Sequence, residues 1–195
     1  MDKHIKPSQI SNTLNRIASK IEASQNPSMT SVLADIGRVI LAVDDGTSEG
    51  KLGCPPAQII SHLNNYLNAK MAISLAYENF ADRVKGPWRD ALVDHWYVHA
   101  KEEREHKYDI SMRILGFGGD ASQSIVQIPQ CPPNLEGFFR VLMAMEIEAI
   151  AAGRETIKLA GDHTSLKVMS ENMILIDTQH LDDLKRSSVQ FELPV

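Results

Sequence analysis

The stretch that decides the fold is "KEEREHKYD", residues 101–109, a charged run in which His106 follows Glu103 at a spacing of three. In a helix these two side chains lie on the same face, one turn apart. Such a run is either the solvated surface of a helix or one part of a buried metal site. The choice depends on whether the rest of the chain supplies partner ligands at matching positions.

The same acid-x-x-His spacing occurs again in "IDTQH", where Asp177 precedes His180. A further carboxylate, Glu146 in "LMAMEIEA", has apolar neighbours at helical spacing, where an unpaired charge would be costly. Di-metal carboxylate bundles use one carboxylate from each of two helices and an acid-x-x-His motif from each of the other two. Bridging carboxylates screen the repulsion between two divalent ions, and imidazoles suit iron. The predicted metal ligands are therefore Glu103, His106, Glu146, Asp177 and His180.

Four long segments with helical periodicity surround these motifs, at about 57–84, 87–115, 135–161 and 164–187. Short turns join the first segment to the second and the third to the fourth, so each pair is expected to form an antiparallel hairpin. Residues 116–133 lie between the pairs and can extend over ~59 Å. A helix of about 28 residues is only ~42 Å long. The sequence therefore predicts an all-α four-helix bundle with a long crossover between its second and third helices.

Residues 1–50 have a different pattern, with two shorter amphipathic helices broken at "QNPS" and a connector rich in Gly, "DGTSEGKLG". We interpret them as an N-terminal helical hairpin appended to a bundle of residues 51–195. Cys54 and Cys131 lead into the first and third helices, which start at opposite ends of such a bundle. Both are therefore predicted to be free thiols, because a disulfide needs Cα atoms within ~7 Å.

The chain has 195 residues and a net charge of −5, which argues against a strongly basic nucleic-acid binder. Support for DNA binding is limited to a small excess of basic residues in the first 22 positions. The polar N-terminus lacks the apolar core of a signal peptide, and no apolar run approaches the ~18 residues of a membrane span. We expect a cytoplasmic protein with no membrane association.

Two stretches of the chain resemble the hairpins of ferritin-like proteins. The first runs from "LNAKMAISLAYENF" through "GPWRDALVDHWYVHAKEEREH", and the second is "AGDHTSLKVMSENMILIDTQHLDDL". The resemblance covers about residues 57–187 and is greatest to Dps-like proteins that carry a bacterioferritin-type di-iron site. The shared features in the first stretch are Tyr77, Gly86, Arg89, His99, Glu103 and His106.

The resemblance implies a role for each predicted ligand. Glu103 and Asp177 would bridge two metal ions. Glu146 and His180 would complete the site of one ion, and His106 would bind the other. The implied metal is iron, with one or two ions per subunit.

Further expectations come from the same resemblance. Tyr77 would donate an electron near the metal, and haem is not expected because Arg104 stands where bacterioferritins carry their haem-ligand Met. The relatives form hollow shells of twelve identical subunits, so a shell-like homo-oligomer is expected here. Trp88, Phe117 and Phe139 lie near helix ends and are candidates for exposed contacts between subunits; the alternative is that they cap the core.

One position departs from the family pattern. The family spacing places a carboxylate 33 residues before Glu103, and this chain has Lys70 there. An ammonium can stand in for a metal ion among carboxylates, so we expect Lys70 to point at Glu103 and Asp177 and to leave the His106 position weak or empty. The alternative is that Lys70 extends to solvent. The neighbours of Lys70 at helical spacing indicate an inward face: Leu63, Leu67, Ser74 and Tyr77.

Three functions stay open at this point. The first is an iron-binding ferritin-like protein that oxidises Fe(II), as a ferroxidase does, and sequesters or detoxifies iron and peroxide in a shell. The second is a non-storage metal-dependent oxidase acting on a small molecule, in which Lys70 would be a catalytic residue; Tyr77 is the candidate catalytic residue of the first. The third is a structural or DNA-associated shell protein with a degenerate metal site.

Overall fold

The computed structural model describes residues 50–122 and 124–190 of the chain, and these residues form four long helices. The helices are α3 (Pro56–Ala81), α4 (Arg89–Gly116), α5 (Leu135–Ala160) and α6 (Thr164–Gln190). No strand occurs within the described ranges, which confirms the all-α prediction. None of these four helices contains an apolar stretch long enough to cross a membrane. The predicted hairpin of residues 1–50 lies outside the described residues, so the division at residue 50 stays a prediction.

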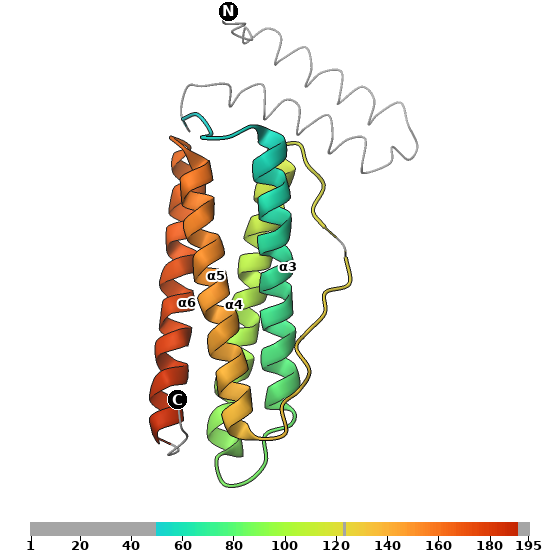
Figure 1. Cartoon of the computed structure of the whole chain (residues 1–195), viewed down its shortest axis with the longest axis vertical. Helices are drawn as coiled ribbons and strands as arrows, with labels where there is room; N and C mark the ends of the chain where they lie inside the picture. Colours follow the sequence, from blue (N-terminus) through green and yellow to red (C-terminus); the bar gives the residue numbers. More distant parts are fainter. Residues whose placement is uncertain (1–49, 123, 191–195) are drawn as a thin grey trace, which may run out of the picture.

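The four helices form two antiparallel hairpins that lie side by side (Figure 1). α3 packs on α4, α5 packs on α6, and the two pairs meet mainly where α3 contacts α5. The described parts of the linker 117–134 run along the bundle, from the end where α4 finishes to the opposite end where α5 begins (Figure 1). This is the long crossover that the linker length predicts. The observed helix ends differ from the predicted ones by at most three residues.

The two cysteines lie in the segments that lead into α3 and α5. These helices begin at opposite ends of the bundle (Figure 1). Cys54 and Cys131 are both free thiols, as the crossover topology requires.

Aromatic rings fill the part of the core near the start of α5. Trp96 meets Phe138 and Phe139 edge-on, with ring centroids 6.3 and 5.4 Å apart. Phe80 stacks on Phe138 at 4.9 Å. Offset and edge-to-face contacts of this kind add to the free energy gained by burying the rings. They fix the α3–α4 pair against α5.

Two of the three aromatic residues proposed as subunit contacts are buried instead. Phe117 is 5% exposed and Phe139 is 1% exposed, so the alternative that they cap the core is the right one. Phe117 turns back towards the bundle and meets the ring of His163 edge-on at 5.3 Å. Trp88 is 42% exposed, so its role in a subunit contact stays a prediction.

The turn between α5 and α6 depends on a glycine. Gly161 has a φ of +59°, a left-handed conformation that L side chains rarely adopt. A Cβ at this position would lie 2.3 Å from the backbone nitrogen of Gly53. That nitrogen donates a hydrogen bond to the carbonyl of Leu159 at 3.0 Å. The close approach holds the segment before α3 against this turn and fixes where α6 begins.

Candidate metal centre

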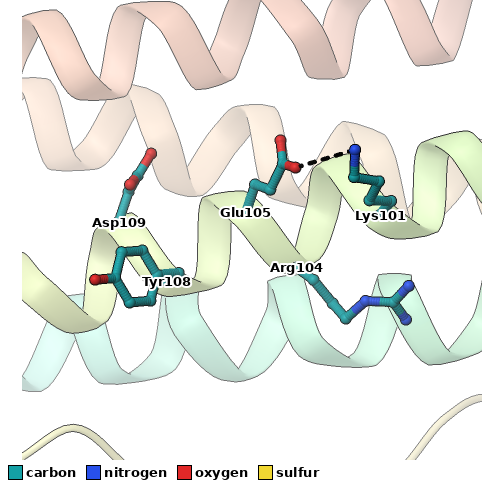
Figure 2. A pocket seen from close by; sticks show the side chains of 5 residues that line it. All are labelled: Lys101, Arg104, Glu105, Tyr108 and Asp109. Carbon is teal, nitrogen blue, oxygen red and sulfur yellow. Dashed lines mark ion pairs between the residues drawn. The ribbon is translucent and has the colours of Figure 1, made fainter.

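α4 divides the charged run 101–109 between two faces. Glu103 and His106 are buried, with 0% and 5% of their surface exposed. The other charged face is open to solvent, and Lys101 pairs there with Glu105 at 3.6 Å (Figure 2). One side of the helix is therefore a solvated surface, as the first interpretation predicts, and the other side is buried, as a metal site would require. The residues around the open pocket on the outer side are Lys101, Arg104, Glu105, Tyr108 and Asp109 (Figure 2).

Four of the five predicted ligands meet between the helices. Glu103 comes from α4, Glu146 from α5, and Asp177 and His180 from α6. Each offers one ligand atom, and these atoms all lie within 4.8 Å of one another. The three carboxylates are fully buried and His180 is 2% exposed. Buried carboxylates so close together repel one another unless cations lie among them, so this is the geometry of a cation site.

His106 lies beside this cluster rather than in it. Its Nδ1 atom is 3.6 Å from Glu103 Oε1 and 3.5 Å from Asp177 Oδ1. Within the described part of the chain Nδ1 has no hydrogen-bond partner. His106 therefore faces the two carboxylates that the family pattern makes bridging ligands, but it is not hydrogen-bonded to either.

Lys70 points into the cluster, and its side chain is fully buried. Its Nζ atom donates a hydrogen bond to Asp177 Oδ1 at 2.5 Å and lies 2.9 Å from Glu103 Oε2. The Asp177 oxygen that it contacts is the one that His106 faces. The ammonium thus lies between the carboxylates as the sequence predicts, and the alternative in which Lys70 extends to solvent is wrong.

The charges of this group depend strongly on one another. Burial by itself opposes a charged ammonium, but Glu103 and Asp177 raise the pKa of Lys70 above its ordinary value. Burial likewise opposes ionisation of Glu103, yet Lys70 holds the pKa of that carboxyl well below its usual range. Burial raises the pKa of Asp177 to about 7 even beside Lys70. Lys70 and Glu103 therefore form a fully charged pair.

The two ring nitrogens of His180 have different surroundings. Nε2 lies 2.8 Å from Glu102 Oε2, whereas Nδ1 lies 3.3 Å from Glu103 Oε1 and 3.2 Å from Glu146 Oε1. Burial alone would lower the pKa of His180, but its hydrogen bonds to Glu103 and Glu146 raise that pKa to about 10. The ring is therefore protonated in the metal-free bundle, and a metal would have to displace the proton on Nδ1. Donation from Nε2–H to a carboxylate is the arrangement that orients metal-binding imidazoles.

Tyr77 contacts Glu146 at the same oxygen that His180 Nδ1 faces. Its hydroxyl donates a hydrogen bond to Glu146 Oε1 at 2.7 Å, and the side chain is fully buried. Burial and the neighbouring Glu146 raise the pKa of Tyr77 well above its ordinary value, so the phenol keeps its proton. The hydrogen bond holds one oxygen of Glu146. The second, Oε2, has no hydrogen-bond partner among the described residues and is free to bind a cation.

The comparisons with known proteins agree with the fold of the bundle. A family model described as a ferritin-like domain matches residues 60–187, well over half of the chain. The chain belongs to the ferritin-like family. It is similar to the crystal structure of a ferritin-like, diiron-carboxylate protein from Bacillus anthracis str. Ames, at 22% identity and a TM-score of 0.65. The match covers 67% of this chain and 95% of that chain and supports the shared fold. No curated protein matches this chain.

The donor atoms of this ferritin-like bundle fit a divalent metal. Buried oxygens of three carboxylates accept no hydrogen bond of good geometry in the described part of the chain: Glu103 Oε1, Glu146 Oε2 and Asp177 Oδ2. Leaving such acceptors without a partner costs free energy that a bound cation would offset. Oxygen ligands together with the Nδ1 atom of His180 form a donor set suited to iron.

One residue of the centre was not singled out from the sequence. Glu102 is partly exposed and contacts His180 from the side away from the carboxylates. It directly precedes Glu103, and a helix turns neighbouring residues ~100° apart, so the pattern places Glu102 outside the ligand face. The signal that could have found it is chemical, because the second nitrogen of a buried ligand His requires a hydrogen-bond partner.

Proposed function

We propose that the chain is an iron-binding ferritin-like protein that takes one iron ion per subunit in the buried cluster and oxidises Fe(II). Glu103, Glu146, Asp177 and His180 would hold the ion. The Lys70 ammonium takes the place of the second ion of the family's metal pair. When iron is bound, it supplies one-electron redox chemistry at a site that the helices shield from water.

The balance of charge in the cluster is the observation that carries this proposal. A bound ion would keep Asp177 ionised, although its pKa is about 7 in the metal-free bundle, and would take His180 as a neutral ligand. In that state the three buried carboxylates bring three negative charges, and the Lys70 ammonium offsets one of them. One divalent ion neutralises the remaining two. Two divalent ions would leave two positive charges in excess in a site that excludes water, which is unfavourable.

The same contacts determine which of the family's two metal positions stays without an ion. Lys70 lies against Glu103 Oε2 and Asp177 Oδ1, and His106 faces that same Asp177 oxygen. An ion beside His106 would meet a fixed positive charge and would lack the carboxylate that the family carries at position 70. The position formed by Glu146 and His180 keeps all its ligands.

A centre with one ion must handle electrons differently from a centre with two. Each Fe(II) gives up one electron, whereas hydrogen peroxide takes two electrons and two protons to become two waters. Tyr77 contacts Glu146 directly, so it can supply the second electron while its proton passes to Glu146 Oε1. The next Fe(II) would then return an electron to Tyr77, and Glu146 would return its proton. The oxidant in this proposal is peroxide or oxygen; oxygen would take up the same two electrons and two protons to become hydrogen peroxide, and in either case the two protons come from solvent.

The burial of the cluster favours iron over a larger substrate. Lys70, Glu103, Glu146 and Asp177 are each 0% exposed. An organic substrate would need a cavity beside these side chains, whereas a metal ion needs only the space among their oxygens. The oxidase acting on a small molecule is therefore the weaker proposal.

The double ion pair of Lys70 favours a second candidate function. Lys70 already binds Glu103 and Asp177, and a protonated His180 would offset a further negative charge. The site could then serve as a metal-free structural core of a shell. The two candidates differ in the number of ions bound, since this one requires none.

Assembly into a shell is part of the proposal and rests on the surface of α4. Large apolar side chains are exposed along this helix and just before it. Monomeric proteins rarely expose large apolar patches, so contacts between subunits would account for these side chains. Light scattering should show a homo-oligomer, and a single chain of 21.7 kDa would contradict this part. DNA binding and a cytoplasmic location stay predictions. The exposed side chains are Trp88, Tyr97, Val98, Tyr108 and Met112.

Anaerobic titration with Fe(II) tests the proposed function. The unmodified protein should bind one ion per chain in the buried cluster, and this ion should be missing from the variant Glu146→Gln, whatever ions bind outside the cluster. The control variant, Glu148→Gln, makes the same change at an exposed position of α5 and should keep the ion. Oxidation of the bound iron by peroxide would support the redox part. Equal binding by the unmodified protein and Glu146→Gln would instead favour the metal-free structural core.

A further inference from the structure

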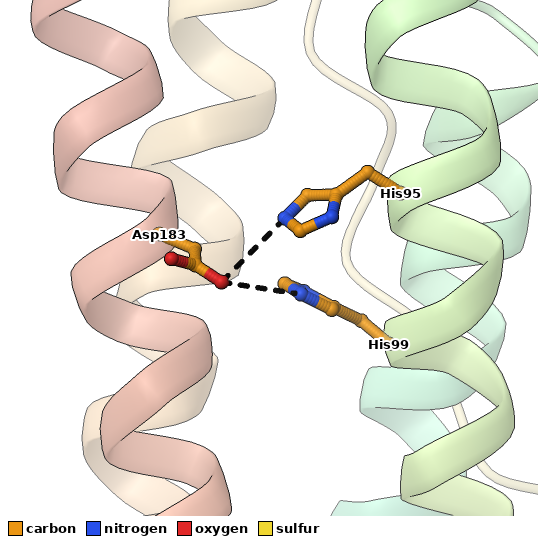
Figure 3. Close-up of side chains that lie close together, drawn as sticks. All are labelled: His95, His99 and Asp183. Carbon is orange, nitrogen blue, oxygen red and sulfur yellow. Dashed lines mark ion pairs between the residues drawn. The ribbon is translucent and has the colours of Figure 1, made fainter.

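A second group of metal-ligand side chains lies between α4 and α6, nearer the surface than the buried cluster. His95 and His99 are four residues apart and point from α4 towards Asp183 on α6 (Figure 3). The Nε2 atoms of His95 and His99 lie 3.7 and 3.9 Å from Asp183 Oδ2. One ligand atom from each of the three residues can be chosen so that all lie within 4.8 Å of one another.

These distances are too long for hydrogen bonds and close to those between ligands of one metal ion. A protein hydrogen bond from nitrogen to oxygen spans ~2.7–3.2 Å. Two ligand atoms that each lie ~2.1 Å from a tetrahedral ion are about 3.4 Å apart. A movement of a few tenths of an ångström would therefore bring each imidazole to a ligand's distance from Asp183 Oδ2, and the ligand atoms of the two histidines already lie within 4.8 Å of one another.

An ordinary ion pair does not account for His99. Its ring is 3% exposed, and its Nδ1 atom has no hydrogen-bond partner among the described residues. Its Nε2 atom lies 3.9 Å from Asp183 Oδ2, beyond hydrogen-bond distance, so the two side chains form no hydrogen-bonded ion pair. The ring stacks on His180 at 4.0 Å, which fixes its orientation.

Asp183 is also oriented by its neighbours. Arg186, one turn further along α6, contacts Asp183 Oδ1 and leaves Oδ2 towards the two imidazoles. The side chain of Asp183 is 31% exposed and that of His95 is 42% exposed. An ion could therefore reach these atoms from solvent and keep water in its open positions.

We propose that His95, His99 and Asp183 bind a divalent first-row transition-metal ion and form the outer station of a route to the buried cluster. Two imidazoles and one carboxylate are ligands for such ions, including Fe(II) and Zn(II). The surface site itself does not depend on the function proposed above; the route does. His99 and His180 also form a ligand group with Glu102, and His180 belongs to the buried cluster. Neighbouring groups thus share a ligand at each step from the surface inwards.

Binding of Co²⁺ to the variant Glu146→Gln tests the surface site alone. This variant lacks a ligand of the buried cluster, and bound Co²⁺ should still give visible absorption bands. The further change His95→Ala or Asp183→Asn should weaken Co²⁺ binding at least about tenfold. Asp182→Asn is the matched control, since this exposed neighbour pairs with Lys185 and should leave binding unchanged. If His95→Ala and Asp183→Asn both bound Co²⁺ as tightly as the parent variant Glu146→Gln, the proposed surface site would be overturned.

The rate at which Fe(II) enters the buried cluster tests the route. In His95→Ala the cluster should fill several-fold more slowly while its final occupancy stays the same. An unchanged rate would overturn the route but leave the surface site in place. If the unmodified protein held no buried iron at all, the proposed function would fail and with it the route, and the Co²⁺ result would still decide the surface site.

Discussion

Replacing Lys70 with Glu should exchange one ammonium for a second metal ion. The variant cluster would contain four carboxylates, and two divalent ions would neutralise them completely. The new carboxylate would also supply the ligand that the His106 position lacks. We therefore expect Lys70→Glu to bind two ions in the bundle instead of one and to oxidise Fe(II) faster.

The same change should destabilise the metal-free protein. Lys70 is fully buried and contacts Glu103 and Asp177, and removing one partner of a buried ion pair costs ~3–5 kcal/mol. The pKa of Asp177, about 7, limits this cost because that carboxyl readily takes up a proton. Each ion present at about 100 times its dissociation constant would restore ~2.7 kcal/mol, so two ions, together ~5.4 kcal/mol, would recover the whole loss.

Urea unfolding with and without metal, at one chain concentration, measures both effects. The variant Lys70→Met separates the loss of the ion pair from the gain of a metal ligand, because it removes the ammonium without adding a carboxylate. Metal should therefore restore less stability to Lys70→Met than to Lys70→Glu. Lys101→Glu makes the same charge change on the exposed face of α4 and should alter the free energy of unfolding by less than ~0.5 kcal/mol. The reasoning is refuted if metal-free Lys70→Glu is as stable as the unmodified protein, or if it still binds a single ion.

Three further predictions concern other parts of the molecule. Tyr77→Phe removes the donor to Glu146 Oε1 and should cost ~1–3 kcal/mol of stability and slow peroxide-driven iron oxidation, whereas an unchanged rate would rule out an electron-donating role. Gly161→Ala should lower the free energy of unfolding by about 2–4 kcal/mol, since it combines a left-handed φ with a backbone clash. The control Gly116→Ala places its Cβ in open space and should not destabilise the protein. Equal effects of the two changes would contradict this account. Both cysteines should react with a thiol reagent in the denatured, unreduced protein, and a disulfide between Cys54 and Cys131 would contradict the crossover topology.

The sequence predicts the bundle closely because its signals are local. Periodicity, glycine and proline breakers, and the length of residues 116–133 define the helices and the crossover without any knowledge of distant contacts. The prediction for Phe117 and Phe139 is less successful, since proximity to a helix end does not reveal whether a ring folds back onto the core. Only the packed structure shows Phe117 against His163.

Some residues of the candidate site can likewise be found from the sequence, and others only from the structure. The spacing within each helix identifies Glu103 and Asp177 as inward-facing, and the position of Lys70 among apolar neighbours indicates that it faces them. The contacts of Glu102 with His180 and of His95 with Asp183 depend on how α4 lies beside α6. No pattern within one helix contains that information, so these residues could be found only in three dimensions.

Anomalous diffraction from a crystal of the unmodified protein grown with Fe(II) tests the central claim most directly. The account predicts one strong iron peak inside the four-helix bundle, next to Glu146 and His180, and no comparable peak between His106 and Lys70. Two peaks of equal height inside the bundle, or none, would contradict the claim that Lys70 replaces one ion of the pair.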